Sequence, residues 1–218
     1  MVKRLDAWVL WVSVWIALFL LLAFLTSEVT TAHSFVVAAD LRFENLLVSI
    51  RTPLLLHIFN WITVLGSVPF VIGIAGVAGF FVRYSKIDRA YVIGLAATLL
   101  GAAATGYGTK VLVERVRPSG LIPSVIETSF SFPSGHATAA MALYGFLTYF
   151  LCALFPEKKA AVLTAAVLLI GVIGFSRLYL GVHFPSDVLA GYLVGGLWLF
   201  IGIAVAKRLR GTETPLPS

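Results

Sequence analysis

Charged side chains are scarce in this 218-residue chain: they make up 12% of the residues, whereas 60% of the residues are hydrophobic. Soluble domains carry about 25% charged and about 45–50% apolar residues. The shortage of charge excludes an ordinary soluble globular protein and indicates that lipid is the main solvent. The length fits one domain with a single core, so we expect residues 1–218 to form one membrane-embedded domain.

Cysteine and histidine are also rare. The one cysteine, Cys152, lies in an apolar run and cannot form an intrachain disulfide, so we interpret it as a small packed hydrophobic residue. No group of His, Cys, Asp and Glu has a metal-ligand spacing, and for His33 and His57 we expect interfacial or packing roles. We therefore expect neither a metal nor another cofactor.

Acidic residues are outnumbered: 10 Asp and Glu stand against 16 Lys and Arg, which gives a net charge of +6. In a soluble protein this balance would suggest a nucleic-acid partner. Here the basic residues lie in small groups between apolar runs, which is typical of a membrane topology signal. We therefore expect the bilayer, and no nucleic acid, as the partner.

Long apolar runs are what the chain has in abundance. A membrane-spanning helix needs about 20 mostly apolar residues. The sequence predicts an all-α, polytopic membrane helix bundle with six spans, the second of which could extend backwards over residues 61–66. The six spans are residues 7–25, 68–82, 91–113, 137–155, 160–175 and 188–206.

The regions outside the spans are also informative. The first span has about 19 apolar residues, which exceeds the apolar core of a cleaved signal peptide, so we expect it to be retained. Charged residues interrupt residues 26–67, for which we expect short helices at the membrane interface, including an amphipathic piece over residues 41–50. The polar tail, residues 211–218, is expected to be flexible.

The distribution of Lys and Arg predicts the orientation, because cytoplasmic loops carry an excess of both. With both termini in the cytoplasm, ten basic residues fall inside and six outside. The inner ones are Lys3, Arg4, Arg83, Lys86, Arg89, Lys158, Lys159, Lys207, Arg208 and Arg210, and the outer ones are Arg42, Arg51, Lys110, Arg115, Arg117 and Arg177. Small residues within the spans are expected to mediate helix packing, namely Gly73, Gly76, Gly79, Gly101, Gly191 and Gly195.

Three short segments fall at span ends that this topology places outside. In the first, Lys110 and Arg117 are seven residues apart, so a helix ending near Arg117, before a proline, would put them on one face about 10.5 Å apart along its axis. Two cations on one face can converge on one anion. They could equally extend toward lipid headgroups.

The second segment, Pro-Ser-Gly-His, precedes the fourth span. Ser134 is suited to cap that helix and Gly135 keeps its backbone accessible, so the first amides and the helix dipole form an anion site with His136 beside it. An ordinary capped turn would have the same sequence.

In the third segment, Arg177 offers a guanidinium that fits two phosphate oxygens. His183 and Asp187 are four residues apart and are neighbours if they are helical. A carboxylate on one imidazole nitrogen leaves the other as a base or nucleophile. A buried structural His–Asp pair is the alternative.

The combined pattern, Lys-x6-Arg-Pro, Pro-Ser-Gly-His and Ser-Arg-x5-His-x3-Asp, resembles the type 2 phosphatidic acid phosphatase family, which is related in fold to the vanadium haloperoxidases. The motifs run from Lys110 to Asp187, and every motif position matches. The resemblance implies a metal-independent lipid phosphatase of the bacterial cytoplasmic membrane, with its active site on the outer side.

The resemblance also implies a role for each matching residue. His183 would be the nucleophile that forms a phosphohistidine, Asp187 would orient it, and His136 would protonate the leaving oxygen and then activate water. Phosphate would be held by Lys110, Arg117, Ser134, Gly135 and Arg177. Candidate substrates are phosphatidylglycerol phosphate, phosphatidic acid and undecaprenyl pyrophosphate.

Two other functions remain possible from the sequence alone. A lipid-to-lipid phosphotransferase would use the same phosphohistidine, whereas a non-catalytic transporter of anionic lipids would use the cations without chemistry. Binding alone needs neither His136 nor the His183–Asp187 pair, which favours an enzyme.

Overall fold

The computed structural model describes residues 2–31, 34–85, 87–118 and 129–211, and within these ranges the chain is helical with no strand. The all-α helix bundle predicted from the sequence is confirmed. The expected flexible tail falls, from residue 212 on, outside the described residues. The helices are α1 (Val2–Thr30), α2 (Phe35–Ser49), α3 (Pro53–Val64), α4 (Val68–Tyr84), α5 (Ala90–Val113), α6 (Gly135–Leu154), the 3-10 turn η1 (Pro156–Lys158), α7 (Lys159–Tyr179) and α8 (Pro185–Arg210).

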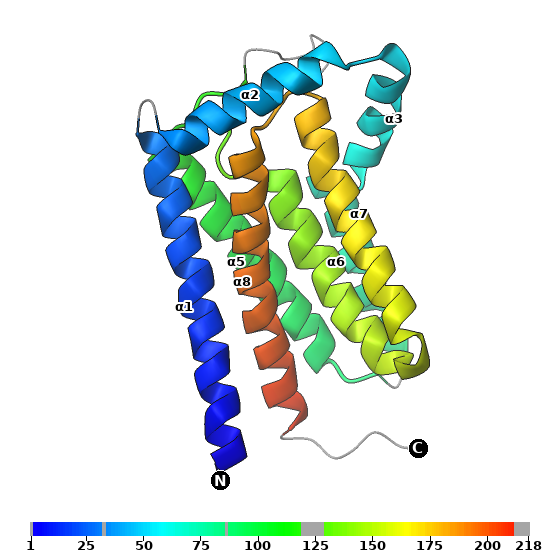
Figure 1. Ribbon diagram of the computed structural model, residues 1–218. Coiled ribbons are helices and arrows are strands. Elements are labelled where there is room, and N and C mark those ends of the chain that lie inside the picture. The colour runs from blue at the N-terminus through cyan, green and yellow to red at the C-terminus, as the bar shows by residue number, and fades with distance from the viewer. Residues whose placement is uncertain (1, 32–33, 86, 119–128, 212–218) are drawn as a thin grey trace.

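Among the described residues, five helices are long and apolar enough to cross a membrane: α1, α5, α6, α7 and α8. Helices α3 and α4 pass the same test together, although they meet at a 42° bend, and counting them as one broken span gives six. The predicted second span, with its backward extension, is this broken pair. The start of α1 and the end of α8 lie at the same end of the bundle (Figure 1), as an even number of crossings requires.

Helix α2 lies across the opposite end of the bundle (Figure 1). Ser34 caps it by accepting a hydrogen bond from the Val37 amide at 3.1 Å. Its buried face carries acids, Asp40 and Glu44, while large hydrophobic side chains such as Phe35, 83% exposed, face outward. Part of the expected interfacial region, residues 26–30, continues α1 instead, because the helix does not break before Thr30.

Helix α8 is the central helix and packs against both α5 and α6. Helices α8 and α6 approach most closely at two glycines of α8. A Cβ on Gly191 would lie only 2.6 Å from the carbonyl oxygen of Ser134, and one on Gly195 only 2.6 Å from the carbonyl oxygen of Thr138. The predicted packing role is confirmed for these two and for Gly101, which lies against Trp198. It is wrong for the three on α4, whose Cβ positions meet no atom within 4 Å because that face is open: Gly73, Gly76 and Gly79.

Candidate active site

The first cationic segment begins in α5 but leaves the helix early. Helix α5 ends at Val113, and Glu114 adopts a left-handed conformation with φ of 50° while donating to the Lys110 carbonyl. The Arg115 carbonyl then accepts a hydrogen bond from the Ser131 amide at 2.8 Å. The prediction that Lys110 and Arg117 share a helix face is therefore wrong, because the chain pairs with residues 129–131 rather than continuing the helix.

Lys110 and Arg117 nevertheless converge. The Lys110 ammonium donates to the Phe130 carbonyl at 2.5 Å, and Arg117 donates to the Ser129 carbonyl at 2.8 Å. The Arg117 guanidinium also lies 3.2 Å from Nε2 of His183. Backbone carbonyls of residues 129 and 130 thus hold both cations, and Arg117 lies beside the candidate nucleophile.

The second segment forms the N-terminus of α6, as predicted. Ser134 is the N-cap, its hydroxyl accepts from the Ala137 amide at 3.5 Å, and its own amide donates to the Asp187 carbonyl at 2.9 Å. Apart from the adjacent residues and the backbone of its own helix, no atom lies within 4 Å of a Cβ placed on Gly135, so the first turn is accessible. This is an open helix N-terminus of the kind that binds phosphate.

His136 lies in that first turn, in the midst of the other candidate residues. It is close enough to interact electrostatically with four of them, which are Arg177, His183, Arg117 and Lys110. The break between α3 and α4 covers it, since a Cβ on Gly66 would lie 3.2 Å from the His136 carbonyl oxygen. The three segments therefore meet in one place.

His183 and Asp187 are neighbours for a reason that differs from the predicted one. His183 precedes α8, so the two do not share a helix face; instead Asp187 at the third helical position folds back and accepts from the Phe184 amide at 2.8 Å. This brings Asp187 Oδ2 to 3.5 Å from His183 Nδ1. Ser131 lies between them, donating to the carboxylate at 2.5 Å and lying 3.3 Å from Nδ1.

Burial keeps the His183 ring neutral. It lowers the pKa of His183 to about 4, and the guanidiniums of Arg177 and Arg117 act in the same direction, while Asp187 opposes them. A neutral ring with Nδ1 beside the carboxylate has its lone pair on Nε2, the nitrogen that faces Arg117. Near pH 7 the geometry therefore presents a nucleophilic nitrogen toward a cluster of cations.

Arg177, in the last turn of α7, is only 2% exposed. Its guanidinium donates to the Thr63 hydroxyl of α3 at 2.8 Å. Sequence reasoning missed Thr63, which lies in an apolar run with nothing around it to mark a polar contact. This bond connects the broken span to the site.

Sequence reasoning also missed the role of a fourth cation, Arg115, and its partners. Arg115 lies 2.6 Å from Asp187 Oδ1 and 2.7 Å from Asp40 Oδ2. The Ser186 hydroxyl accepts a hydrogen bond from Arg115 at 2.7 Å and donates one to Asp40. The sequence did show a charged residue, Asp40, in a mostly apolar segment, and it placed Arg115 among the outer cations. Nothing in the spacing connects the two.

The described residues contain no group of three or more His, Cys, Asp and Glu side chains that could hold a metal ion. His57 accepts a hydrogen bond from Trp61 at 3.1 Å on the exposed side of α3, away from the site, and His33 lies outside the described residues. The positive charge around the site comes from Lys and Arg side chains.

Comparison with protein families gives a match to the PAP2 superfamily over residues 90–210, which include all eight predicted site residues. The chain is 36% identical to phosphatidylglycerophosphatase B of Bacillus subtilis, over 85% of this chain and 91% of that protein. It is 32% identical to lipid A 4'-phosphatase of Bacteroides thetaiotaomicron, over 61% and 62% of the two chains.

Solved structures give a similar result. The crystal structure of the transmembrane PAP2-type phosphatidylglycerolphosphate phosphatase from Bacillus subtilis superposes with a TM-score of 0.80 at 30% identity, covering 93% of this chain and 98% of that one. Aquifex aeolicus LpxE superposes with a TM-score of 0.61 at 25% identity, covering 78% and 95%.

Proposed function

The chain belongs to the PAP2 superfamily and is a membrane-embedded lipid phosphatase, and we propose that it hydrolyses a lipid phosphate or pyrophosphate monoester through a phosphohistidine on His183. The observation that carries this proposal is the placement of that ring between two charges of opposite sign. Nδ1 faces Asp187 at 3.5 Å, and Nε2 faces the Arg117 guanidinium at 3.2 Å. A phosphate attracted by the cations would be presented to the nitrogen that can attack it.

In the first half-reaction Nε2 of His183 attacks phosphorus, the bond from phosphorus to the lipid oxygen breaks, and His136 gives that oxygen its proton. In the second, His136 takes a proton from water, the water oxygen bonds to phosphorus, and the bond to His183 breaks. Splitting one difficult hydrolysis in this way lowers each barrier.

Charge stabilisation supplies the remaining catalysis. A transferring phosphoryl group spreads negative charge over its equatorial oxygens. These oxygens would be held by the three cations and by the N-terminus of α6, donors that are already in place before reaction. The groups assigned to this role are Lys110, Arg117, Arg177, Ser134 and Gly135.

Among the candidate lipids, phosphatidylglycerol phosphate has the most support, because the Bacillus subtilis relatives similar over most of their length carry that activity in their names. Phosphatidic acid and undecaprenyl pyrophosphate are the alternatives. A panel of purified lipid phosphates assayed for phosphate release in detergent would rank them. Transfer of radiolabel to a second lipid, in place of phosphate release, would indicate a phosphotransferase. Binding of the lipid without either reaction would indicate a transporter.

We predict that phosphate release is unchanged in excess EDTA, because side-chain cations take the place of a divalent ion at the phosphate. Vanadate should inhibit, because its trigonal bipyramidal form mimics the transition state that the site binds. The measurement is the rate of phosphate release with each addition. Loss of activity in EDTA that magnesium restores would show that the chemistry is misassigned.

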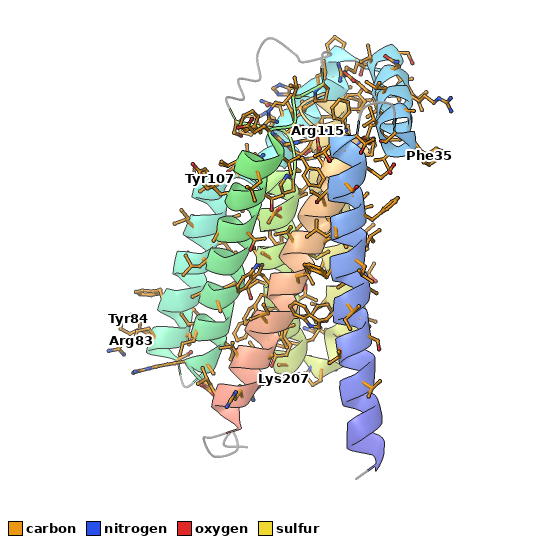
Figure 2. All side chains as sticks on the ribbon, turned by 90° about the vertical axis from the view of Figure 1, so that its left-hand side faces the viewer. Phe35, Arg83, Tyr84, Tyr107, Arg115 and Lys207 are labelled. Atoms are coloured by element: carbon orange, nitrogen blue, oxygen red, sulfur yellow. The ribbon has the colours of Figure 1, made fainter. Side chains whose placement is uncertain are left out.

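We further propose that the site faces the outside of a bacterial cytoplasmic membrane and that both termini are cytoplasmic. Figure 2 shows Arg115 at the same end as Phe35 of α2, with Arg83 and Lys207 at the opposite end. The end with the termini thus carries basic residues expected to lie inside. The side chains of Lys3, Arg4 and Lys86, which are also expected inside, lie outside the part of the chain whose side chains the structure describes.

An impermeant thiol reagent tests this orientation. With Cys152 removed, single cysteines at Asn45 of α2 and at Lys158 of η1, both exposed, should react from opposite sides of the membrane. In intact cells we expect labelling at position 45 only. Labelling of both positions from one side, or of position 158 alone in intact cells, would contradict the proposed topology.

A further inference from the structure

Asp187 has a second ionic partner besides His183. Oδ1 of Asp187 accepts from the Arg115 guanidinium at 2.6 Å, and the exposed fractions of the two side chains are 8% for Arg115 and none for Asp187. The ring of Phe184 packs against the guanidinium, and its centre lies 4.4 Å from Cζ of Arg115. In a site of such low exposure, the charge of Arg115 acts strongly on Asp187.

Arg115 is in turn neutralised from another part of the fold. Its second nitrogen donates to Asp40 Oδ2 at 2.7 Å, and Asp40, which comes from the surface helix α2, is 2% exposed. Asp40 also accepts hydrogen bonds from the amide, at 3.1 Å, and from the hydroxyl of Ser186 in the first turn of α8. Ser186 directly precedes Asp187, so Asp40 holds the segment that carries the catalytic carboxylate.

The charges of this buried group add up in a way that matters for catalysis. Two carboxylates, Asp40 and Asp187, share one guanidinium, that of Arg115, so the group carries one net negative charge. When Nε2 of His183 attacks phosphorus, the ring becomes positive, and that negative charge stabilises it. Without Asp40 the charge of Arg115 would cancel that of Asp187.

We propose that Asp40 and Arg115 are positioning residues for the reaction at His183: Arg115 fixes the orientation of Asp187, and Asp40 neutralises Arg115 so that Asp187 keeps its full effect on the imidazole. The inference rests on the phosphohistidine mechanism proposed above. It assigns a role to α2, which lies outside the three sequence motifs and whose side chains the mechanism does not otherwise use.

The test is the rate of phosphoenzyme formation, followed by rapid quench with a labelled aryl phosphate. In Asp40→Asn, which keeps the shape and an accepting oxygen, we expect formation about 10–100-fold slower, by analogy with the loss found when the carboxylate behind a metal-ligating histidine is removed. KM should change little, because Asp40 does not touch the phosphate. Asp40→Glu should recover much of the rate, since it restores the charge.

The double variant Asp40→Asn with Arg115→Gln separates this role from a purely structural one. It again has one net negative charge at Asp187, so it should react faster than Asp40→Asn alone. If the two residues only support the fold, the rates of both variants should follow their folded fractions, measured by thermal unfolding beside the rate, because removing one partner of a buried ion pair is itself destabilising. A double variant slower than Asp40→Asn would therefore overturn the proposal.

Glu44 provides a matched control. It is a buried carboxylate one turn further along α2, and it interacts electrostatically with Arg51. Glu44→Gln should form the phosphoenzyme at close to the original rate. A wild-type rate in Asp40→Asn would refute the inference, whereas a wild-type protein that forms no phosphohistidine would refute the proposed function itself.

Discussion

Replacing His183 with alanine is expected to abolish turnover on every substrate, by at least about 10⁴-fold, because the proposed mechanism then lacks the nitrogen that attacks phosphorus. His183 is 4% exposed and lies at the junction of the segments that carry Arg117, Ser131 and Asp187. In the proposed mechanism His136 acts on the leaving oxygen, so it would not take over the attack on phosphorus. The measurement is phosphate release from both a lipid phosphate and an aryl phosphate.

His136→Ala provides the contrast that makes this prediction specific. Loss of a general acid costs about 10²–10⁴-fold when the leaving group is a poor one such as a lipid alkoxide. It should cost much less with a pyrophosphate or an aryl phosphate, whose leaving oxygens need little protonation. An equal loss on both kinds of substrate would contradict the assignment of His136 as the proton donor.

Asp187→Asn should keep the fold and lose on the order of 10³–10⁴-fold in rate, because an amide cannot stabilise the cationic ring or fix its tautomer, as in a Ser-His-Asp system. The structure adds a second reason. Asp187 accepts hydrogen bonds from Arg115, Ser131 and the Phe184 amide, and an amide nitrogen would face at least one of these donors.

Thermal unfolding and size-exclusion profiles should be measured beside the rate, to show that Asp187→Asn is folded. Ser131→Ala is the matched control, because it removes a hydrogen bond to the same carboxylate oxygen and leaves the charge in place. We expect a loss of about tenfold for it. A folded Asp187→Asn variant within tenfold of the wild-type rate would show that the carboxylate is dispensable.

Local patterns in the sequence predicted much of the bundle and some details of the site. The lengths of the apolar runs located the spans. The Ser-Gly-His order predicted the capped start of α6, because a serine before a helix can accept a hydrogen bond from a first-turn amide. Small residues at Gly191 and Gly195 predicted close packing of α8, since only a missing side chain permits that approach.

Other features depend on contacts between distant segments, which spacing alone does not contain. The end of α5 at Val113 follows from pairing of Arg115 with Ser131, whereas the sequence offered only Pro118 as a stop signal. Asp40 meets Ser186 across 146 positions, and Thr63 meets Arg177 across 114. For such residues the sequence indicated unusual charge or polarity in an apolar region but gave no partner.

The central claim is tested most directly by finding which residue carries the phosphate. The protein would be mixed with labelled aryl phosphate, quenched in alkali, which preserves phosphohistidine, and digested for mass spectrometry of the modified peptide. We predict an acid-labile phosphate on His183, present in His136→Ala and absent from His183→Ala. A phosphate on His136 that persists in His183→Ala would reverse the two roles and contradict the account.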